Sequence, residues 1–130
     1  MLLEMHLLGV EASMRAFFII NDPPYGTERV YNALRVAHAL VKKDPATEVA
    51  LFLMADAVLA AKAGQKTPDG YYNVERMLKH VLAGHGRVLL CGICMGARGL
   101  TDTELMEGAR RSTMDELAAA TLAADKVLVF

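Results

Sequence analysis

Short, wholly apolar runs recur along the chain and divide it into regular segments. Four of them stand out: AFFII at 16–20, VALFL at 49–53, VLL at 88–90 and VLVF at 127–130. A strand with one face in water alternates polar and apolar residues, whereas a strand covered on both faces is apolar throughout. The pattern therefore predicts strands that are buried on both faces, as in a parallel sheet.

The stretches between these runs carry apolar residues at helical spacing. The apolar face of the first such stretch consists of Val30, Ala33, Leu34, Ala37, Leu40 and Val41. Thr27 is placed to cap this helix, since a threonine side chain can accept a bond from the free N–H groups at a helix start. The sequence ADAVLAAKAG at 55–64 predicts a short helix that Gly64 ends, and QKTPDGYYN at 65–73 predicts a loop.

The second half of the chain shows the same helical signals. A third helix is predicted to end at Gly84, and its apolar face consists of Val74, Met77, Leu78, Val81 and Leu82. Thr101 with Glu104, and Thr113 with Glu116, fit the capping box that starts a helix, so two further helices are expected there. The intervening MEGARRS at 106–112 is a candidate for an additional short strand.

Alternating strands and helices define the fold class. Buried strands that alternate with helices predict an α/β protein, with a three-layer α/β/α sandwich around a mainly parallel sheet. Ligands of such sheets bind beyond the carboxyl ends of the strands. Two loops lie at such ends: NDPPYGTE at 21–28 and CGICMGARG at 91–99.

Composition narrows the class of protein. Apolar residues make up 54% and charged residues 22% of the 130 residues, which excludes a disordered chain and leaves apolar surface for an oligomeric interface. The formal net charge is −1 and the Lys and Arg residues are scattered, so we expect no nucleic-acid partner. No apolar run approaches the roughly 20 residues that span a bilayer, so we expect no membrane association.

Residues 1–13 precede the first predicted strand and stand apart from the domain. The opening MLLEMHLLGVEASM is apolar but interrupted by Glu4, His6 and Glu11, and neither a basic start nor a clear cleavage site marks it as a signal peptide. We therefore expect a cytoplasmic protein with reduced thiols. Residues 14–130 form the single predicted domain, and residues 1–13 are an N-terminal extension or the product of an upstream start.

Both cysteines of the chain lie in the second of the two loops. Cys91 ends a predicted strand, Cys94 follows in the turn, and Gly92, Gly96, Arg98 and Gly99 surround them. Backbone N–H groups freed by the glycines, and the positive charge of Arg98, both favour a thiolate, which is the reactive form of cysteine. The alternative interpretation is that each cysteine is a small buried hydrophobe at a strand end.

The spacing of these residues weighs against three familiar arrangements. A thioredoxin-like pair opens a long helix, which the glycines disfavour, so dithiol exchange stays open without being preferred. Six residues lie between Cys91 and Arg98, and three lie between Cys94 and Arg98. Neither number is the spacing between cysteine and arginine in a tyrosine-phosphatase loop. Zinc would need His80 or His85 with the cysteines, but His85 and Cys91 lie at opposite strand ends, roughly 15–20 Å apart. We expect no metal site and no cofactor.

The first loop offers a possible wall for the same site. Pro23, Pro24 and Gly26 make it rigid, and the helix that begins near Thr27 presents N–H groups suited to an anion. Tyr25 and Glu28 are its candidate site residues, while the loop also suits a plain connection between strand and helix. No GxGxxG or Walker pattern accompanies it, so nucleotide binding has no support. The pair Tyr71–Tyr72 favours packing or an interface over a site.

Several blocks of the sequence resemble a known family. PYGTERVYNALRVAHAL, LFLMADAV, GQKTPDGYYNVERML, LLCGICMGARGL and LAADKVLVF, in this order, are similar to the DsrE/DsrF-like family and most of all to its YchN-type branch. The resemblance covers residues 14–130. It implies a five-stranded, mainly parallel sheet, and a homohexamer, built from trimers, with a cysteine at the subunit clefts.

The resemblance also implies a chemistry. Sulfur-relay relatives, the TusD and DsrE subunits, carry sulfur as a cysteine persulfide between donor and acceptor proteins, on a cysteine shortly before an Arg-Gly pair. That pair is Arg98-Gly99 here, and the family spacing leads back to Cys91. The chain also has Cys94, as YchN-type members do, so the reactive thiol could be either cysteine.

These observations lead to three hypotheses about function. The first is an intracellular sulfur-relay protein, a persulfide carrier or sulfurtransferase, in which Cys91 carries sulfur and Cys94 resolves or protects it. Arg98 and the N–H groups around Gly92, Gly96 and Gly99 would stabilise the anion, with Tyr25 and Glu28 lining the cleft. The alternatives are a noncatalytic hexamer that binds a small ligand or partner, and a Cys-x-x-Cys dithiol redox protein.

Overall fold

The computed structural model describes residues 14–130 as a single five-stranded sheet. The strands are β1 (Arg15–Ile20), β2 (Glu48–Leu53), β3 (Arg87–Cys91), β4 (Ala109–Ser112) and β5 (Lys126–Val129). They are arranged in the order β4-β3-β2-β1-β5, and every neighbouring pair is parallel. The predicted parallel sheet is therefore confirmed. The predicted N-terminal extension, residues 1–13, lies outside the described residues.

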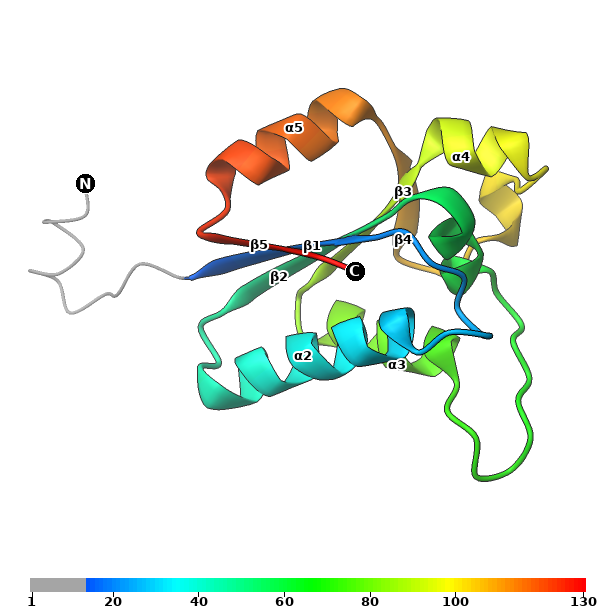
Figure 1. Ribbon diagram of the computed structural model, residues 1–130, viewed down its shortest axis with the longest axis horizontal. Helices are drawn as coiled ribbons and strands as arrows, with labels where there is room; N and C mark the ends of the chain where they lie inside the picture. Colours follow the sequence, from blue (N-terminus) through cyan, green and yellow to red (C-terminus); the bar gives the residue numbers. More distant parts are fainter. Residues whose placement is uncertain (1–13) are drawn as a thin grey trace, which may run out of the picture.

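Helices cover both faces of this sheet. In Figure 1, α2 (Arg29–Lys43) and α3 (Val74–Ala83) lie on one face, while α4 (Gly92–Ala97) and α5 (Met114–Ala123) lie on the other. Two short 3₁₀ helices, η1 (Ala55–Ala61) and η2 (Asp102–Glu104), complete the connections. The arrangement is the three-layer α/β/α sandwich that the alternation of strands and helices predicts.

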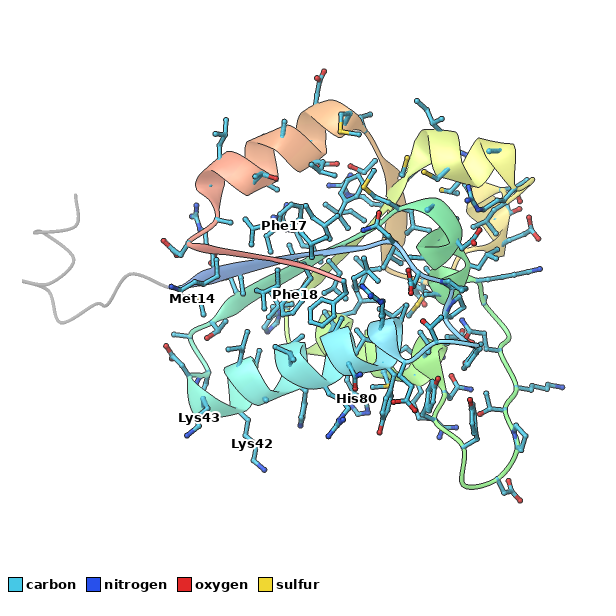
Figure 2. The ribbon with its side chains drawn as sticks, in the orientation of Figure 1. Met14, Phe17, Phe18, Lys42, Lys43 and His80 are labelled. Atoms are coloured by element: carbon cyan, nitrogen blue, oxygen red, sulfur yellow. The ribbon has the colours of Figure 1, made fainter. Side chains whose placement is uncertain are left out.

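The core explains why the central strands are apolar throughout. Phe17 and Phe18 are consecutive residues of β1, and Figure 2 shows their side chains on opposite sides of the sheet. Both are fully buried, Phe17 against the ring of Phe52 and Phe18 against that of Phe130. Since helices cover both faces of the sheet, residues on either face of a central strand are buried and are therefore apolar.

Local signals placed the end of α3 and the start of α5 correctly, but the segment predicted to end at Gly64 forms the 3₁₀ helix η1, which ends at Ala61. Helix α3 ends at Gly84, and α5 begins at Thr113, whose side chain accepts a bond from the backbone N–H of Glu116. The weak strand signal in MEGARRS is confirmed as β4, at the edge of the sheet.

Three expectations about helix starts need correction. Glu28, and not Thr27, occupies the N-cap position of α2, and it makes no side-chain capping bond. The capping box of Thr101 and Glu104 is formed, but it opens only the three-residue η2. The largest difference is the helix α4, which begins immediately after Cys91 in a segment where the glycines predicted none.

Within the described part of the chain, no helix combines the length and the apolar character needed to cross a membrane.

Candidate functional site

The two cysteines meet where β3 passes into α4. Cys91 is the last residue of β3 and also the N-cap residue of α4. Its Sγ accepts a hydrogen bond from the backbone N–H of Cys94, with 3.3 Å between sulfur and nitrogen. The thiol thus takes the place that a serine or aspartate oxygen usually holds at a helix start. This geometry keeps Cys91 and Cys94 in the same helical turn.

Burial dominates the ionisation of Cys91. Only 9% of the residue is exposed, whereas Cys94 is half-buried. Burial raises the pKa of the Cys91 thiol, and a hydrogen bond with the Cys94 side chain raises it further, against a smaller lowering by the Cys94 N–H. The backbone N–H groups of Ile93 and Cys94 lower this pKa, as the loop predicted, but desolvation outweighs them in the single chain and the net shift is upward.

The glycines shape the helix that follows rather than prevent it. Gly92 and Gly96 lie inside α4, and Met95 between them is fully buried. Gly99, with φ at +65°, ends the helix: its N–H bonds to the Gly96 carbonyl, and the N–H of Leu100 bonds to that of Met95. These two bonds form a Schellman motif. Buried Met95 and this cap stabilise a helix of six residues despite its glycines.

Gly92 also permits close approach of the neighbouring strand. A Cβ at this position would lie 3.1 Å from the Arg111 side chain and 3.2 Å from the carbonyl oxygen of Ser112. The Gly92 carbonyl accepts a bond from Nη1 of Arg111 at 3.0 Å. From the sequence, Gly92 was expected to free backbone N–H groups for a ligand. In the structure, Gly92 packs closely against β4.

Arg98 faces an acidic partner instead of the thiol. Its Nε lies 2.8 Å from Oδ1 of Asp56, and its Nη1 donates to the Cys94 carbonyl at 3.1 Å. Arg98 was expected to lie beside the Cys91 sulfur. In the single chain its guanidinium forms an ion pair with Asp56 of η1 instead. Arg98 instead fixes the end of α4 against η1.

A polar group beside Cys91 escaped the sequence analysis. Ser112 of β4 is the register partner of Cys91 and is itself buried. Its hydroxyl donates to the carboxylate of Glu116, which also accepts two bonds from Arg110, at 2.6 and 2.9 Å. The ion pair with Arg110 and the Ser112 bond lower the pKa of Glu116 to about 2. The strand signal at 106–112 was the available clue, but it carried no indication of a site.

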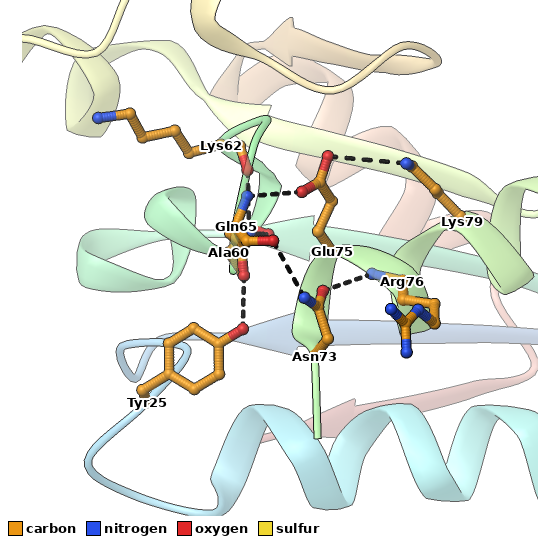
Figure 3. Close-up of polar contacts among 8 residues, drawn as sticks. All are labelled: Tyr25, Ala60, Lys62, Gln65, Asn73, Glu75, Arg76 and Lys79. Atoms are coloured by element: carbon orange, nitrogen blue, oxygen red, sulfur yellow. Dashed lines mark hydrogen bonds and ion pairs between the residues drawn. The ribbon is translucent and has the colours of Figure 1, made fainter. Parts of the chain in front are cut away.

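Tyr25 belongs to a different polar network. Its hydroxyl donates to Oε1 of Gln65 at 2.7 Å and accepts from the N–H of Val74 at 3.0 Å, as Figure 3 shows for the Gln65 contact. Gln65 in turn donates to the carbonyls of Ala60 and Lys62, and its backbone N–H donates to Glu75. These bonds tie the first loop to η1 and α3. They do not bring Tyr25 to the cysteines, and Glu28 lies exposed at the start of α2.

The four tyrosines of the chain stack against one another. Tyr72 lies between Tyr31 and Tyr71, with ring centroids 4.3 and 4.6 Å away, and Tyr25 stacks on it at 5.7 Å. The pair Tyr71–Tyr72 therefore packs, as its sequence suggested.

Metal ligands do not gather around the cysteines. Within residues 14–130, no group of three or more His, Cys, Asp and Glu side chains is placed to hold an ion. His85 precedes the amino end of β3, while Cys91 closes its carboxyl end.

Comparison with known proteins places this architecture in a family. The profile of the DsrE/DsrF-like family matches residues 14–130. Protein YchN of Escherichia coli K12 is 43% identical over 112 residues, which are 86% of this chain and 95% of YchN. The chain belongs to the DsrE/DsrF-like family. The uncharacterized protein MJ0989 of Methanocaldococcus jannaschii is 38% identical over 117 residues, covering 90% of this chain and all of that protein.

Solved structures agree with this membership of the DsrE/DsrF-like family. The crystal structure of the ychN protein from E. coli matches with a TM-score of 0.85 and 41% identity, over 90% of this chain and 99% of the other. MTH1491 of Methanobacterium thermoautotrophicum, described as a protein of unknown function, matches with a TM-score of 0.73 over 92% of this chain and all of its own. At 12% identity, that likeness shows the shared fold alone.

Proposed function

We propose that this protein is a cytoplasmic sulfur-relay protein that carries sulfur as a persulfide on the Cys91–Cys94 pair. One observation carries the proposal: two free cysteines share the first turn of a helix at the carboxyl end of a buried parallel strand. That edge is where α/β sheets bind their ligands. Membership in the DsrE/DsrF-like family supports a role related to sulfur relay. The cytoplasm keeps both thiols reduced, which the reaction requires.

The proposed transfer conserves electrons. The sulfur of Cys91 attacks the terminal sulfur of a donor persulfide, so a new S–S bond forms and the S–S bond of the donor breaks. The donor leaves as a thiolate and takes up the proton lost from Cys91, which leaves Cys91–S–SH and a donor thiol. An acceptor thiolate then removes the terminal sulfur by the same kind of exchange.

Cys94 has a separate role in this scheme. Its N–H bonds to the Cys91 sulfur and both residues share the first turn of α4, so Cys94 lies within reach of a persulfide there. If no acceptor arrives, the Cys94 thiolate attacks the inner sulfur, which releases hydrosulfide and closes a Cys91–Cys94 disulfide. Cys94 therefore limits the lifetime of the persulfide.

Labelling by a persulfide donor tests this proposal. The reduced protein is incubated with cysteine persulfide, and each cysteine is examined by peptide mass spectrometry for one added sulfur atom. We expect the Cys94→Ser variant to keep the persulfide on Cys91 longer than the wild type, and the Cys91→Ser variant to lose it. Absence of added sulfur on both cysteines, in protein whose thiols alkylate normally, would refute the proposal.

The start of α4 at Cys91 favours a second candidate, a dithiol redox protein. A Cys-x-x-Cys pair in the first turn of a helix is the arrangement of disulfide oxidoreductases. This candidate predicts a reversible Cys91–Cys94 disulfide with a reduction potential between about −180 and −270 mV, and turnover with a reductase. The relay requires neither.

We further propose that the protein works as a homo-oligomer, a hexamer built from trimers. Within residues 114–123, which form α5, no residue is buried, although Leu117, Leu122 and the four alanines are apolar. Exposed apolar residues of a helix gain by being covered, since burial removes them from water. A second copy of the chain would cover it, in agreement with the assembly that the family resemblance implies.

A further inference from the structure

A cavity lies between α2 and α3, far from the cysteines. It has a volume of about 430 Å³, within the range of small-molecule sites. Figure 1 shows α2 and α3 on the face of the sheet opposite α4 and α5. Val49 at the start of β2 and Gly86 before β3 line it, so it lies toward the amino ends of strands whose carboxyl ends hold the cysteines.

Apolar side chains form most of the cavity wall. Leu34, Ala37 and Val41 line it from α2, and Met77 and Val81 line it from α3. Ala37, Gly84 and Gly86 also line the cavity and add little or no side-chain volume to its wall. The walls therefore suit an aliphatic group, which gains by leaving water.

Positive or proton-binding groups line the same cavity. Arg35 and His38 contribute from α2 and His80 from α3, and no Asp or Glu of residues 14–130 is among the lining residues. Figure 2 shows His80 beside these helices, with Lys42 and Lys43 at the end of α2. A ligand that places an anionic group here meets the Arg35 guanidinium from α2 and imidazole N–H donors from both helices.

Thr47 adds an unpartnered polar atom. It lines the cavity and is 7% exposed, and its hydroxyl has no hydrogen-bond partner among residues 14–130. Buried hydroxyls are almost always paired, because folding removes their bonds to water. A polar ligand atom, or a water molecule held with the ligand, would restore the missing bond.

We propose that the cavity between α2 and α3 binds a medium-chain aliphatic carboxylate. The chain of such a ligand would lie against the apolar walls, and its carboxylate would bond to Arg35, His38 and His80. The proposal is independent of the sulfur chemistry, since it uses none of the residues around Cys91.

Titration with octanoate tests the proposal on the full chain. Octan-1-ol has the same chain without the charge, and octyltrimethylammonium reverses the charge. We expect octanoate to bind about tenfold more tightly than octanol, as charge-assisted bonds would give, and the ammonium ion to show no saturable binding. Calorimetry gives the affinities, and amide shifts in NMR spectra should centre on α2 and α3.

Variants separate the charge from the cavity. Arg35→Gln combined with His38→Gln and His80→Gln should lower octanoate affinity to that of octanol and leave octanol unchanged. The matched control is Arg29→Gln, at the start of the same helix, where Arg29 faces Asp22 at 3.5 Å. Ala37→Leu should weaken both ligands by filling the cavity; should that variant not fold, the glutamine variant still decides.

Three results would overturn the proposal. If octanol binds as tightly as octanoate, the charged side chains do not contribute to binding. If the amide shifts centre on other elements, octanoate does not bind in this cavity. If octanoate does not bind, and Met77→Lys lowers the oligomeric state in sedimentation velocity, the groove is an interface between copies of this chain and not a ligand site.

Discussion

At the scale of single residues, the ionisation of Cys91 decides when this thiol could act in the proposed sulfur relay. Burial and the neighbouring Cys94 thiol raise its pKa, while the Cys94 N–H supplies one donor to the sulfur. A thiol held protonated is protected from oxidation and alkylation, since the thiolate is the nucleophile. A donor or a second subunit that adds donors around the sulfur would activate it.

The burial and the raised pKa of Cys91 predict that the two cysteines are alkylated at different rates. We expect iodoacetamide to modify half-buried Cys94 first at pH 7, and to modify Cys91 at an appreciable rate only above about pH 8.5, the usual thiol pKa. Rates for Cys91 are measured in Cys94→Ser, and those for Cys94 in Cys91→Ser. A Cys91 rate that already levels off below pH 8 would contradict the raised pKa.

The carboxylate of Glu116 makes folding stability depend on acid pH. Its folded-state pKa of about 2 lies below the usual value of about 4.3, so the stabilisation is present above pH 4.3 and is lost as pH falls toward 2. Because Arg110 is largely exposed, Glu116→Gln should cost no more than about 1 kcal/mol at pH 7. Urea unfolding at pH 7, 5 and 3 should show the two proteins converging at low pH; a constant difference would exclude the ion pair as its cause.

At the scale of elements, α4 is a short helix that depends on its two ends. The Cys91 thiol caps its start, and Gly99 and Leu100 close its end in a Schellman motif. Short helices are marginal by themselves, so buried Met95 and these caps provide most of the stability. The position of Cys94 relative to Cys91 is therefore set by the cap residues as much as by the cysteines.

Two glycines of this segment should respond in opposite ways to alanine. Gly99→Ala forces a side chain into the left-handed region at φ +65° and should destabilise the fold by about 1 kcal/mol. Gly96→Ala lies inside α4 with open space at its Cβ, and should stabilise by about 0.5–1 kcal/mol. Urea denaturation of both variants checks the signs; equal destabilisation would mean that α4 is not formed in solution.

At the scale of the whole molecule, one face of the sandwich is incompletely covered. Leu122 on α5 is 89% exposed, and Val129 on the edge strand β5 is also exposed. An apolar helix beside an open edge strand is a surface that proteins usually cover by association. Ile93, in the first turn of α4, is a further exposed apolar residue.

Charge on this surface should therefore disrupt assembly. We expect Leu122→Asp to lower the molar mass measured by light scattering after size-exclusion chromatography, because an aspartate cannot be buried without a partner. The control, Lys66→Asp, changes an exposed residue of the loop between η1 and α3 and should leave the mass unchanged. An assembly that tolerates Leu122→Asp would place the interface elsewhere.

The sequence alone determined the five strands and the helices α2, α3 and α5, and it placed both cysteines at the carboxyl end of a buried strand. These properties depend on residues close together in the chain: apolar runs, helical spacing, capping residues and glycine stops. The parallel sheet followed from them, because strands that are apolar on both faces need helices on both sides.

The tertiary structure alone decided what surrounds the cysteines. Arg98 bonds to Asp56, 42 residues away, and Tyr25 to Gln65, 40 residues away, so neither partner is visible in a local pattern. The formation of α4 depends on burial of Met95, and the pKa of Cys91 depends on what covers its sulfur. Desolvation and long-range pairing arise when distant segments pack, which is why the position of the two cysteines in the fold could be predicted and their electrostatic surroundings could not.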